Sequence, residues 1–264
     1  MVQRYGAAIL ALLLAACHGS QPRPRAPQGP APAGPPPSTA VARYRIDPRQ
    51  SELRLLVYRA GAMAALGHNH VIVNRALDGW VVDGGATAAG APGASSFALS
   101  IPVAKFQVDE ADRRREEGAD FAAPVSAEAA AATLHNLQSA ALLDAAQFPM
   151  ITVRSVGLAT AGATLRATVS VSVAGHESTL EAPFTLVRSP GELTACGTLA
   201  VKQTALGLTP FSVMLGALRV QDEIQVKFRL VAVYAAESAD NNRMQVPSGA
   251  VSAAAGECRS GGGT

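Results

Sequence analysis

Much of the middle of the chain alternates apolar and polar residues with a period of two. The clearest run covers 165–173, where Leu, Ala and Val at odd positions alternate with Arg, Thr and Ser. The same alternation recurs at 179–186 and 224–230. Half-buried antiparallel strands produce this pattern, because successive side chains point to opposite faces of a sheet. Pro183 favours an edge or a strand end for the second run, since proline cannot donate a ladder hydrogen bond.

Shorter runs of the same kind predict further strands. They cover 51–58, 71–74, 77–83, 95–103, 150–158 and 193–202. Turn signals such as Asp83-Gly84-Gly85 and Pro190-Gly191 separate them. Many short strands joined by small turns are typical of a sandwich or an up-and-down barrel. We expect one folded all-β domain over 43–235, which is long enough to bury a substantial core.

The region 109–147 is the exception, because its patterns are helical. Its first acidic and basic residues are spaced i,i+4, as ion pairs on a helix are. Ser126 then precedes a run of strong helix formers over 127–137 and fits the N-cap position. We expect a helical insertion that covers one mouth or edge of the barrel. The charged run 112–117 is interpreted as a solvated helix surface.

The chain begins with a pattern that resembles a bacterial lipoprotein signal over 1–16. A charged start with Arg4 leads into a short apolar run, and Leu14-Ala15-Ala16 precedes Cys17. The resemblance implies that Cys17 is acylated and anchors the protein to a membrane of the cell envelope, on its periplasmic face. His18 stands where an inner-membrane retention signal has Asp, which favours the outer membrane. An ordinary signal peptide with an incidental Cys17 is the alternative.

Both flanks of the expected domain have the composition of unfolded chain. Residues 17–42 are rich in proline and contain almost nothing apolar to bury, so we expect an extended linker. Residues 236–264 are rich in Ser, Ala and Gly without periodicity and predict a disordered tail. A bridge between a strand and such a tail is a poor arrangement, so Cys196 and Cys258 are expected as free thiols.

Charge and composition exclude several classes of function. The 22 basic and 20 acidic residues are mixed and give a formal net charge of +2, with no basic stripe for nucleic acid. No nucleophile elbow, phosphate-binding loop or dinucleotide fingerprint is present, so an enzyme ranks behind a binding protein. No cofactor is required by any motif, and the sequence indicates no oligomeric state.

Several short motifs, in order and with suitable spacing, resemble the YceI-like family. They are Tyr44-Arg45-Ile46-Asp47, Leu142-Leu143-Asp144, Phe148-Pro149-Met150-Ile151, Val171-Ser172-Val173-Ala174-Gly175-His176 and Gln203-Thr204-Ala205-Leu206-Gly207-Leu208. The resemblance implies a lipocalin-like antiparallel up-and-down β-barrel of about eight strands. It further implies non-enzymatic binding or carriage of a long apolar ligand, polyisoprenoid-like or another lipid. The chain departs from the family pattern in having Gln203 for Arg and Leu206 for Phe.

Candidate ligand contacts flank the irregular segments that meet the open end of such a barrel, or lie on the inward alternation. They are Met63, Leu66, His68, His70, Leu134, Leu137, Phe148, Val171 and Phe211. A structural, adhesin-like lipoprotein is a further alternative, and it predicts a barrel filled by side chains.

His68 and His70 are two residues apart, so on a strand they face the same side. We expect them close together at one rim of the barrel, where they contact the head of the ligand. Two imidazoles on one face also bind Zn²⁺ or Cu²⁺ when further ligands converge, and His176, His135 or a carboxylate is the candidate third ligand. The rival function is therefore a metal-binding or redox-linked envelope protein.

Overall fold

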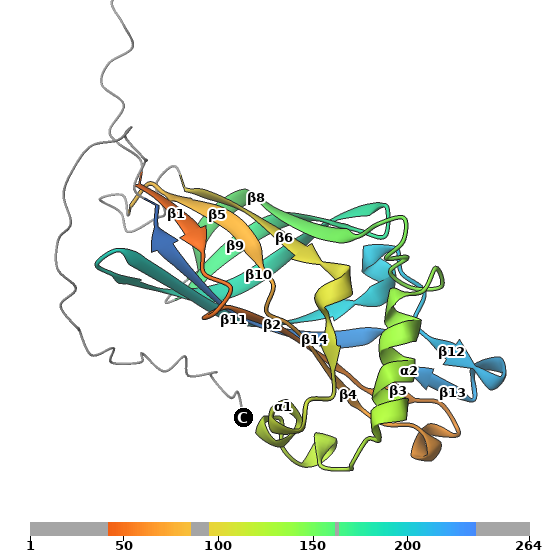
Figure 1. Ribbon diagram of the computed structural model, residues 1–264. Helices are drawn as coiled ribbons and strands as arrows, with labels where there is room; N and C mark the ends of the chain where they lie inside the picture. Colours follow the sequence, from red (N-terminus) through yellow and green to blue (C-terminus); the bar gives the residue numbers. More distant parts are fainter. Residues whose placement is uncertain (1–41, 86–94, 162–163, 236–264) are drawn as a thin grey trace, which may run out of the picture. The chain divides into compact units, whose positions relative to one another are not determined.

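The computed structural model describes residues 42–85, 95–161 and 164–235, which form a mostly β structure (Figure 1). Its strands are β1 (Ala42–Ile46), β2 (Glu52–Val57), β3 (Arg59–Ala60), β4 (His70–Asn74), β5 (Asp78–Asp83), β6 (Ser96–Pro102), β7 (Gln107–Val108), β8 (Met150–Ala161), β9 (Thr164–Val173), β10 (His176–Ser189), β11 (Glu192–Lys202), β12 (Ser212–Val213), β13 (Leu218–Val220) and β14 (Glu223–Tyr234). Two α-helices, α1 (Ala111–Glu116) and α2 (Ala127–Gln138), lie between β7 and β8 in the chain.

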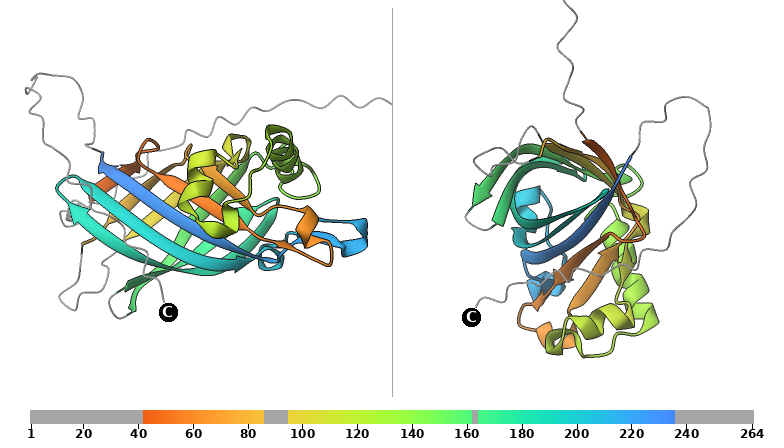
Figure 2. Two further views of the ribbon diagram at one scale, coloured as in Figure 1. Left: turned by 90° about the horizontal axis from the view of Figure 1, so that it is seen from below. Right: turned by 90° about the vertical axis from the view of Figure 1, so that its left-hand side faces the viewer.

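Eight antiparallel strands close into a barrel, which Figure 2 shows along its length and from one end. Their order is β1-β5-β6-β8-β9-β10-β11-β14, and β14 pairs back with β1. Strand β14 is long enough to serve two neighbours: residues 232–234 pair with β1, and residues 225–229 pair with β2. Strands β2, β4 and β7 continue the sheet to one side of the closed barrel. The predicted fold class, a lipocalin-like β-barrel with a helical insertion, is confirmed.

The period-two runs are confirmed as strands with one inward face. In β9 the apolar side chains from Ala167 to Val173 are buried at every second position. Strand β10 runs straight through Pro183, which pairs with Arg166 of β9, so of the two expected positions, an edge or a strand end, the strand end is wrong. The β10–β11 ladder, however, begins only at Thr185 and Cys196. The proline therefore lies beside a gap in that ladder.

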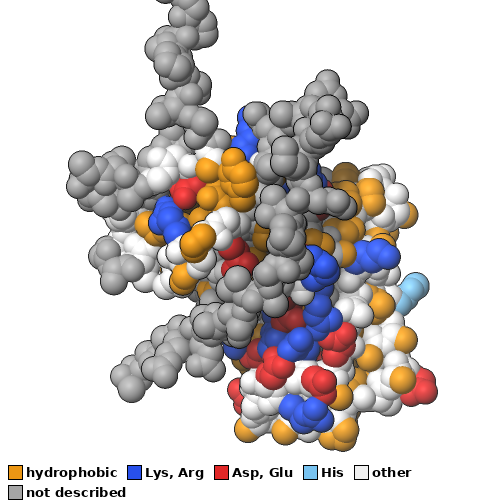
Figure 3. Space-filling model, turned by 60° about the vertical axis from the view of Figure 1, so that its left-hand side comes forward, with side chains coloured by type: hydrophobic (Ala, Val, Ile, Leu, Met, Phe, Trp, Pro, Cys, Tyr) orange, Lys and Arg blue, Asp and Glu red, His pale blue; other side chains and the backbone are white. Residues whose placement is uncertain are grey.

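The charged run 112–117 is solvated only in part: Asp112, Arg115 and Glu116 are exposed as expected, but for Arg114 and Glu117 the expectation is wrong. The Arg114 side chain is buried and donates to the Asp109 carboxylate at 2.5 Å. Glu117, which is also almost fully buried, accepts from Arg54 of β2 at 2.6 Å. These pairs attach α1 to the side extension of the barrel, and Figure 3 shows basic and acidic side chains gathered on one face.

Helix α2 matches its prediction. Ser126 is the N-cap, and its hydroxyl accepts from the backbone N–H of Ala129 at 3.2 Å. The buried Leu137 packs into the main core together with Phe106 and Leu143. The helix thereby covers one end of the barrel, as Figure 1 shows.

Cys196 is disulfide-bonded, so the expectation of a free thiol there is wrong. Its partner is outside the described residues, as are Cys17, most of the 17–42 linker and the 236–264 tail. Within the described residues, no helix is both long and apolar enough to cross a membrane.

Candidate ligand-binding site

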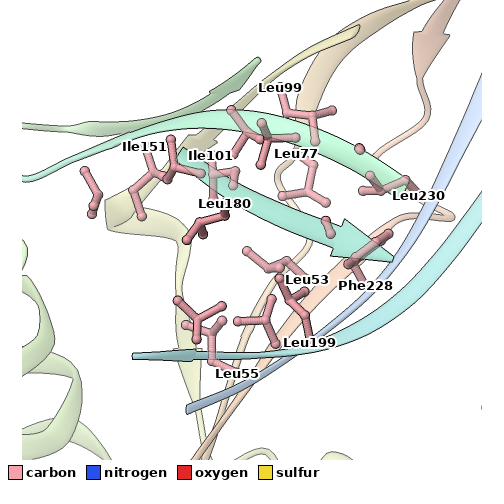
Figure 4. Close-up of a pocket in the computed structure, with 18 of the residues that line it drawn as sticks. Leu53, Leu55, Leu77, Leu99, Ile101, Ile151, Leu180, Leu199, Phe228 and Leu230 are labelled. Atoms are coloured by element: carbon pink, nitrogen blue, oxygen red, sulfur yellow. The ribbon is translucent and has the colours of Figure 1, made fainter. Parts of the chain in front are cut away.

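The barrel is hollow and contains a cavity of about 390 Å³. Inward residues of all eight barrel strands line it, because each strand sends every second side chain toward the axis. Figure 4 shows labelled residues of this wall, among them Leu53, Leu99, Leu180 and Phe228, converging on one space. The volume lies within the range of small-molecule pockets, about 300–1,000 Å³. A barrel filled by its own side chains, as the adhesin alternative predicts, is not what the structure shows.

All but eight of the lining residues are apolar. The eight polar ones are Asp83, Ser95, Ser96, Arg188, His70, Thr133, Asn136 and Gln203. The register of the strands shows that these polar residues lie at two opposite ends of the barrel. Arg188 pairs with Leu193, which pairs with Ala232 at the end of β14, whereas His70 connects through β2 to Gln225 at its beginning. The cavity thus has a charged end near Arg188 and a second polar end near His70 and α2.

An ion pair spans the charged end. Arg188 Nε donates to Asp83 Oδ2 at 3.0 Å, and Arg188 Nη2 donates to Asp83 Oδ1 at 3.3 Å. Their strands, β10 and β5, are four strands apart in either direction around the barrel. The pair therefore crosses the mouth between opposite walls. The hydrogen bond from Arg188 holds the pKa of Asp83 below its ordinary value, against the smaller opposing effect of burial.

At the α2 end, His70 is held by a buried carboxylate. His70 Nδ1 lies 2.6 Å from Oδ2 of Asp109, whose side chain has no exposed surface. The other oxygen, Oδ1, accepts from Arg114 and from the backbone N–H of Val71. An ionised carboxylate accepts only, so His70 carries its proton on Nδ1 when neutral, and Nε2 is then an acceptor.

Burial raises the pKa of Asp109, but the hydrogen bonds from His70, Val71 and Arg114 and the charge of His70 outweigh it and lower the pKa overall. The carboxylate is therefore ionised at neutral pH. Asp109 also has a left-handed backbone, with φ of 58°. Asp tolerates this conformation better than most residues, because its short side chain bonds locally.

The predicted contact residues divide into two groups. His70, Leu137, Val171 and Phe211 line the cavity. The others lie elsewhere: Leu134 packs in the core beside the cavity, Phe148 packs against Gly175, and Met63, Leu66 and His68 lie in or beside the segment before β4.

His68 and His70 are close, as expected, with ring centroids 6.3 Å apart. His176 packs against Gly207 instead: a Cβ on that glycine would lie 2.5 Å from the His176 ring. In the described ranges no three His, Cys, Asp or Glu side chains form a group able to hold a metal ion. The third ligand proposed from sequence is thus not brought to the pair, and zinc or copper binding by His68 and His70 stays a prediction.

Apart from His70, the polar side chains at the two ends of the cavity were not predicted from the sequence. Asp83 and Arg188 are 105 residues apart, and no local pattern relates them. Thr133 and Asn136 were detectable in principle, because they lie one turn apart on the helix face that carries Leu137. Gln203 stands out in the sequence only as a departure from the family pattern, and the structure places it in the wall of the cavity.

The sequence model of the YceI-like domain family matches residues 44–232 of this chain. Among solved structures, BcnA of Burkholderia cenocepacia is 19% identical, with 71% of this chain and 99% of that chain covered and a TM-score of 0.50. A domain from Saccharophagus degradans, described as polyisoprenoid binding and implicated in plant cell wall breakdown, is 14% identical. It covers 74% of this chain and 99% of its own, with a TM-score of 0.47. No curated protein matches the chain. At these identities the structural likeness speaks to fold alone, but the family match extends over most of the sequence: the chain belongs to the YceI-like domain family.

Proposed function

We propose that this protein binds and carries one long apolar ligand, of polyisoprenoid or related lipid type, without transforming it. The observation that carries the proposal is the hollow barrel whose wall is apolar except at its two ends. Such a wall takes a hydrocarbon chain out of water, which is favourable by about 25 cal/mol per Å² of apolar surface before the cost of ordering the ligand. The Saccharophagus degradans domain, which shares the family's barrel, is described as binding polyisoprenoids.

The ligand is oriented by the difference between the ends. The hydrocarbon tail runs toward Asp83 and Arg188, whose charges satisfy each other. The head lies at the α2 end, where His70 Nε2, Thr133 and Asn136 offer hydrogen-bonding groups on the cavity wall. A neutral head with a hydroxyl or carbonyl fits these groups, since His70 already has its charged partner in Asp109.

The proposal includes a location and assigns no reaction to the cavity. The expected acylation of Cys17 anchors the carrier to the outer membrane, facing the periplasm. The charged side chains that line the cavity, Asp83 and Arg188, are bonded to each other, and the one imidazole in the described lining, His70, is assigned to the ligand head. The polar lining suits positioning of a head group better than chemistry.

The test is native mass spectrometry of the untagged protein from its own envelope, followed by lipid extraction. Wild type is expected to carry one extractable lipid. Ala182→Trp fills the cavity from the inward face of β10 and is expected to lower occupancy at least about tenfold, because added volume displaces the ligand. Thr179→Trp adds the same ring on the exposed face of that strand and serves as the control. Absence of lipid from wild type, or equal occupancy in both variants, contradicts the proposal.

A further inference from the structure

A small three-stranded sheet, β12-β13-β3, projects past the α2 end of the barrel (Figures 1 and 2). Two short 3-10 turns complete it: η1 (Ala64–Leu66) and η5 (Met214–Gly216). Four of its apolar side chains are exposed, and we call them the apolar tip: Leu66, Val213, Met214 and Leu215. Leu66 is 67% exposed, Met214 is 59% exposed and Leu215 is fully exposed. A cluster of this kind on a convex projection is unusual for a surface that faces only water.

Strand pairing and backbone hydrogen bonds hold the segments that carry the apolar tip in place. Arg219 pairs with Ser212 on one side and with Ala60 on the other. The backbone N–H of Met63 donates to Ala217 O at 2.8 Å and ties the two turns together. Met214 and Leu215 have left-handed backbones, with φ of 52° and 53°. Side chains of this size rarely adopt that conformation, and such strain gathers at functional sites.

The ionised side chains that the two segments of the projecting sheet carry are all basic. Residues 59–69 and 202–221, which contain the projecting sheet, hold Arg59, Lys202 and Arg219 and no Asp or Glu. Asp222 and Glu223, at the start of β14, are the nearest acidic residues in the chain, and they line a surface pocket together with Ser212 and Arg219. Among the described residues neither Arg59 nor Arg219 forms an ion pair, and the guanidinium of Arg59 donates to Gly67 O at 2.7 Å. Exposed apolar side chains with cations beside them are the composition that binds an anionic membrane surface.

We propose that the apolar tip inserts into a lipid bilayer with anionic head groups and sets the α2 end of the barrel against it. The projecting sheet adjoins the cavity: Phe211, just before β12, and Val220, the last residue of β13, both line it. Docking there lets an apolar ligand pass between bilayer and cavity with little exposure to water. The docking itself goes beyond the proposed function, because it does not depend on the ligand.

The test measures which part of the protein enters the membrane. The full chain is reconstituted into phosphatidylcholine vesicles with and without phosphatidylglycerol, made with brominated acyl chains that quench tryptophan. The single native tryptophan, Trp80, is changed to Phe. Leu215→Trp is then compared with Val187→Trp, a 54% exposed position next to Arg188 at the opposite end of the barrel. Reconstitution makes the comparison independent of the lipid anchor, since both variants are equally attached.

We expect quenching and a blue shift for Leu215→Trp and water-like emission for Val187→Trp. Removing phosphatidylglycerol is expected to reduce the quenching at least about threefold. Equal quenching at both positions, or at neither, overturns the proposal. A blue shift without vesicles that grows with protein concentration shows that a second copy covers the apolar tip, and it also overturns the proposal. None of these readouts involves cavity occupancy, so failure here is distinct from failure of the carrier function.

Discussion

The two ends of the barrel each contain an aspartate bonded to a basic side chain, yet the two pairs do different things. Asp83 and Arg188 come from opposite strands, so their bond crosses the lumen and joins two walls. Asp109 and His70 come from the same side of the molecule, so their bond orients one ring against one wall. The Asp83–Arg188 pair therefore obstructs one mouth of the barrel, whereas the Asp109–His70 bond leaves Nε2 of His70 able to accept a hydrogen bond from a ligand.

The two aspartate pairs also differ in how deeply they are buried. Asp109 is fully buried, and the side chain of Arg114 beside it is only 8% exposed. The Arg188 side chain is 40% exposed, so water screens its pair with Asp83. Because the Asp109–Arg114 pair is buried, breaking it costs much free energy. Because the Asp83–Arg188 pair is exposed, breaking it costs little. We therefore expect the α2 end to be a rigid recognition site and the opposite end to be a weak closure.

The largest effect is expected from breaking the buried group. Asp109→Asn keeps the shape and tolerates the left-handed backbone, but it leaves Arg114 buried without a counter-charge. The free energy of unfolding is expected to fall by about 3 kcal/mol. Urea denaturation followed by circular dichroism measures it. Asp112→Asn, at an exposed pair with Arg115, is the control and is expected to leave the midpoint unchanged. Equal effects of the two substitutions contradict the assignment.

The apolar wall of the cavity was predictable from the sequence, but the hollow space inside it was not. Alternation in 165–173 and 224–230 gave the wall, because a strand with one inward face needs apolar residues at every second position. The same pattern describes a filled core equally well, since it says which way side chains point and not how far apart the walls stand. Only the structure shows that the barrel encloses a cavity.

Polar contacts were predictable only where they were local. The Ser126 N-cap bonds three residues ahead, and the sequence shows it. The Asp83–Arg188 pair depends on barrel closure, which brings β5 and β10 face to face. The burial of Glu117 in the run 112–117 was not predictable, because its partner Arg54 lies on a strand 63 residues away in the chain. Long-range geometry decided the last two of these cases.

The next largest effect concerns recognition at the α2 end. His70→Asn keeps a donor for Asp109 but removes the atom equivalent to Nε2. Loss of one hydrogen bond to the ligand head, worth about 1 kcal/mol, is expected to weaken lipid affinity about fivefold. Competition with a fluorescent lipid measures this affinity. His68→Asn is the matched change outside the cavity lining and is expected to have no effect. A larger loss for His68→Asn reverses the assignment.

A smaller effect is expected for the closure. Arg188→Leu removes the bridge across the mouth while keeping an apolar stem. The barrier to ligand release is expected to fall by about 0.7 kcal/mol, which corresponds to roughly threefold faster release. Stopped-flow transfer of the bound lipid to acceptor vesicles gives the rate. Arg166→Leu breaks an exposed pair with Glu181 on the outer face of β9 and β10, and its rate should equal that of wild type. Slower release from Arg188→Leu is the opposite of what a closure predicts.

The smallest effect is the part of the acid pH dependence of stability that comes from Asp83. The pKa of Asp83 is lowered from its ordinary value of 3.8 by the hydrogen bond from Arg188. The contribution of the pair to stability is therefore complete above that ordinary value and disappears as pH falls through the lower folded value. Because Arg188 is well exposed, the contribution is less than about 1 kcal/mol. Below pH 4, wild type should lose unfolding free energy more steeply than Arg188→Leu, in which Asp83 has lost its partner. Denaturation at pH 5 and at steps below pH 4 measures both slopes. Parallel curves would mean that the ion pair across the mouth contributes nothing to the folded state, and the rigid α2 end alone would then distinguish one end of the barrel from the other.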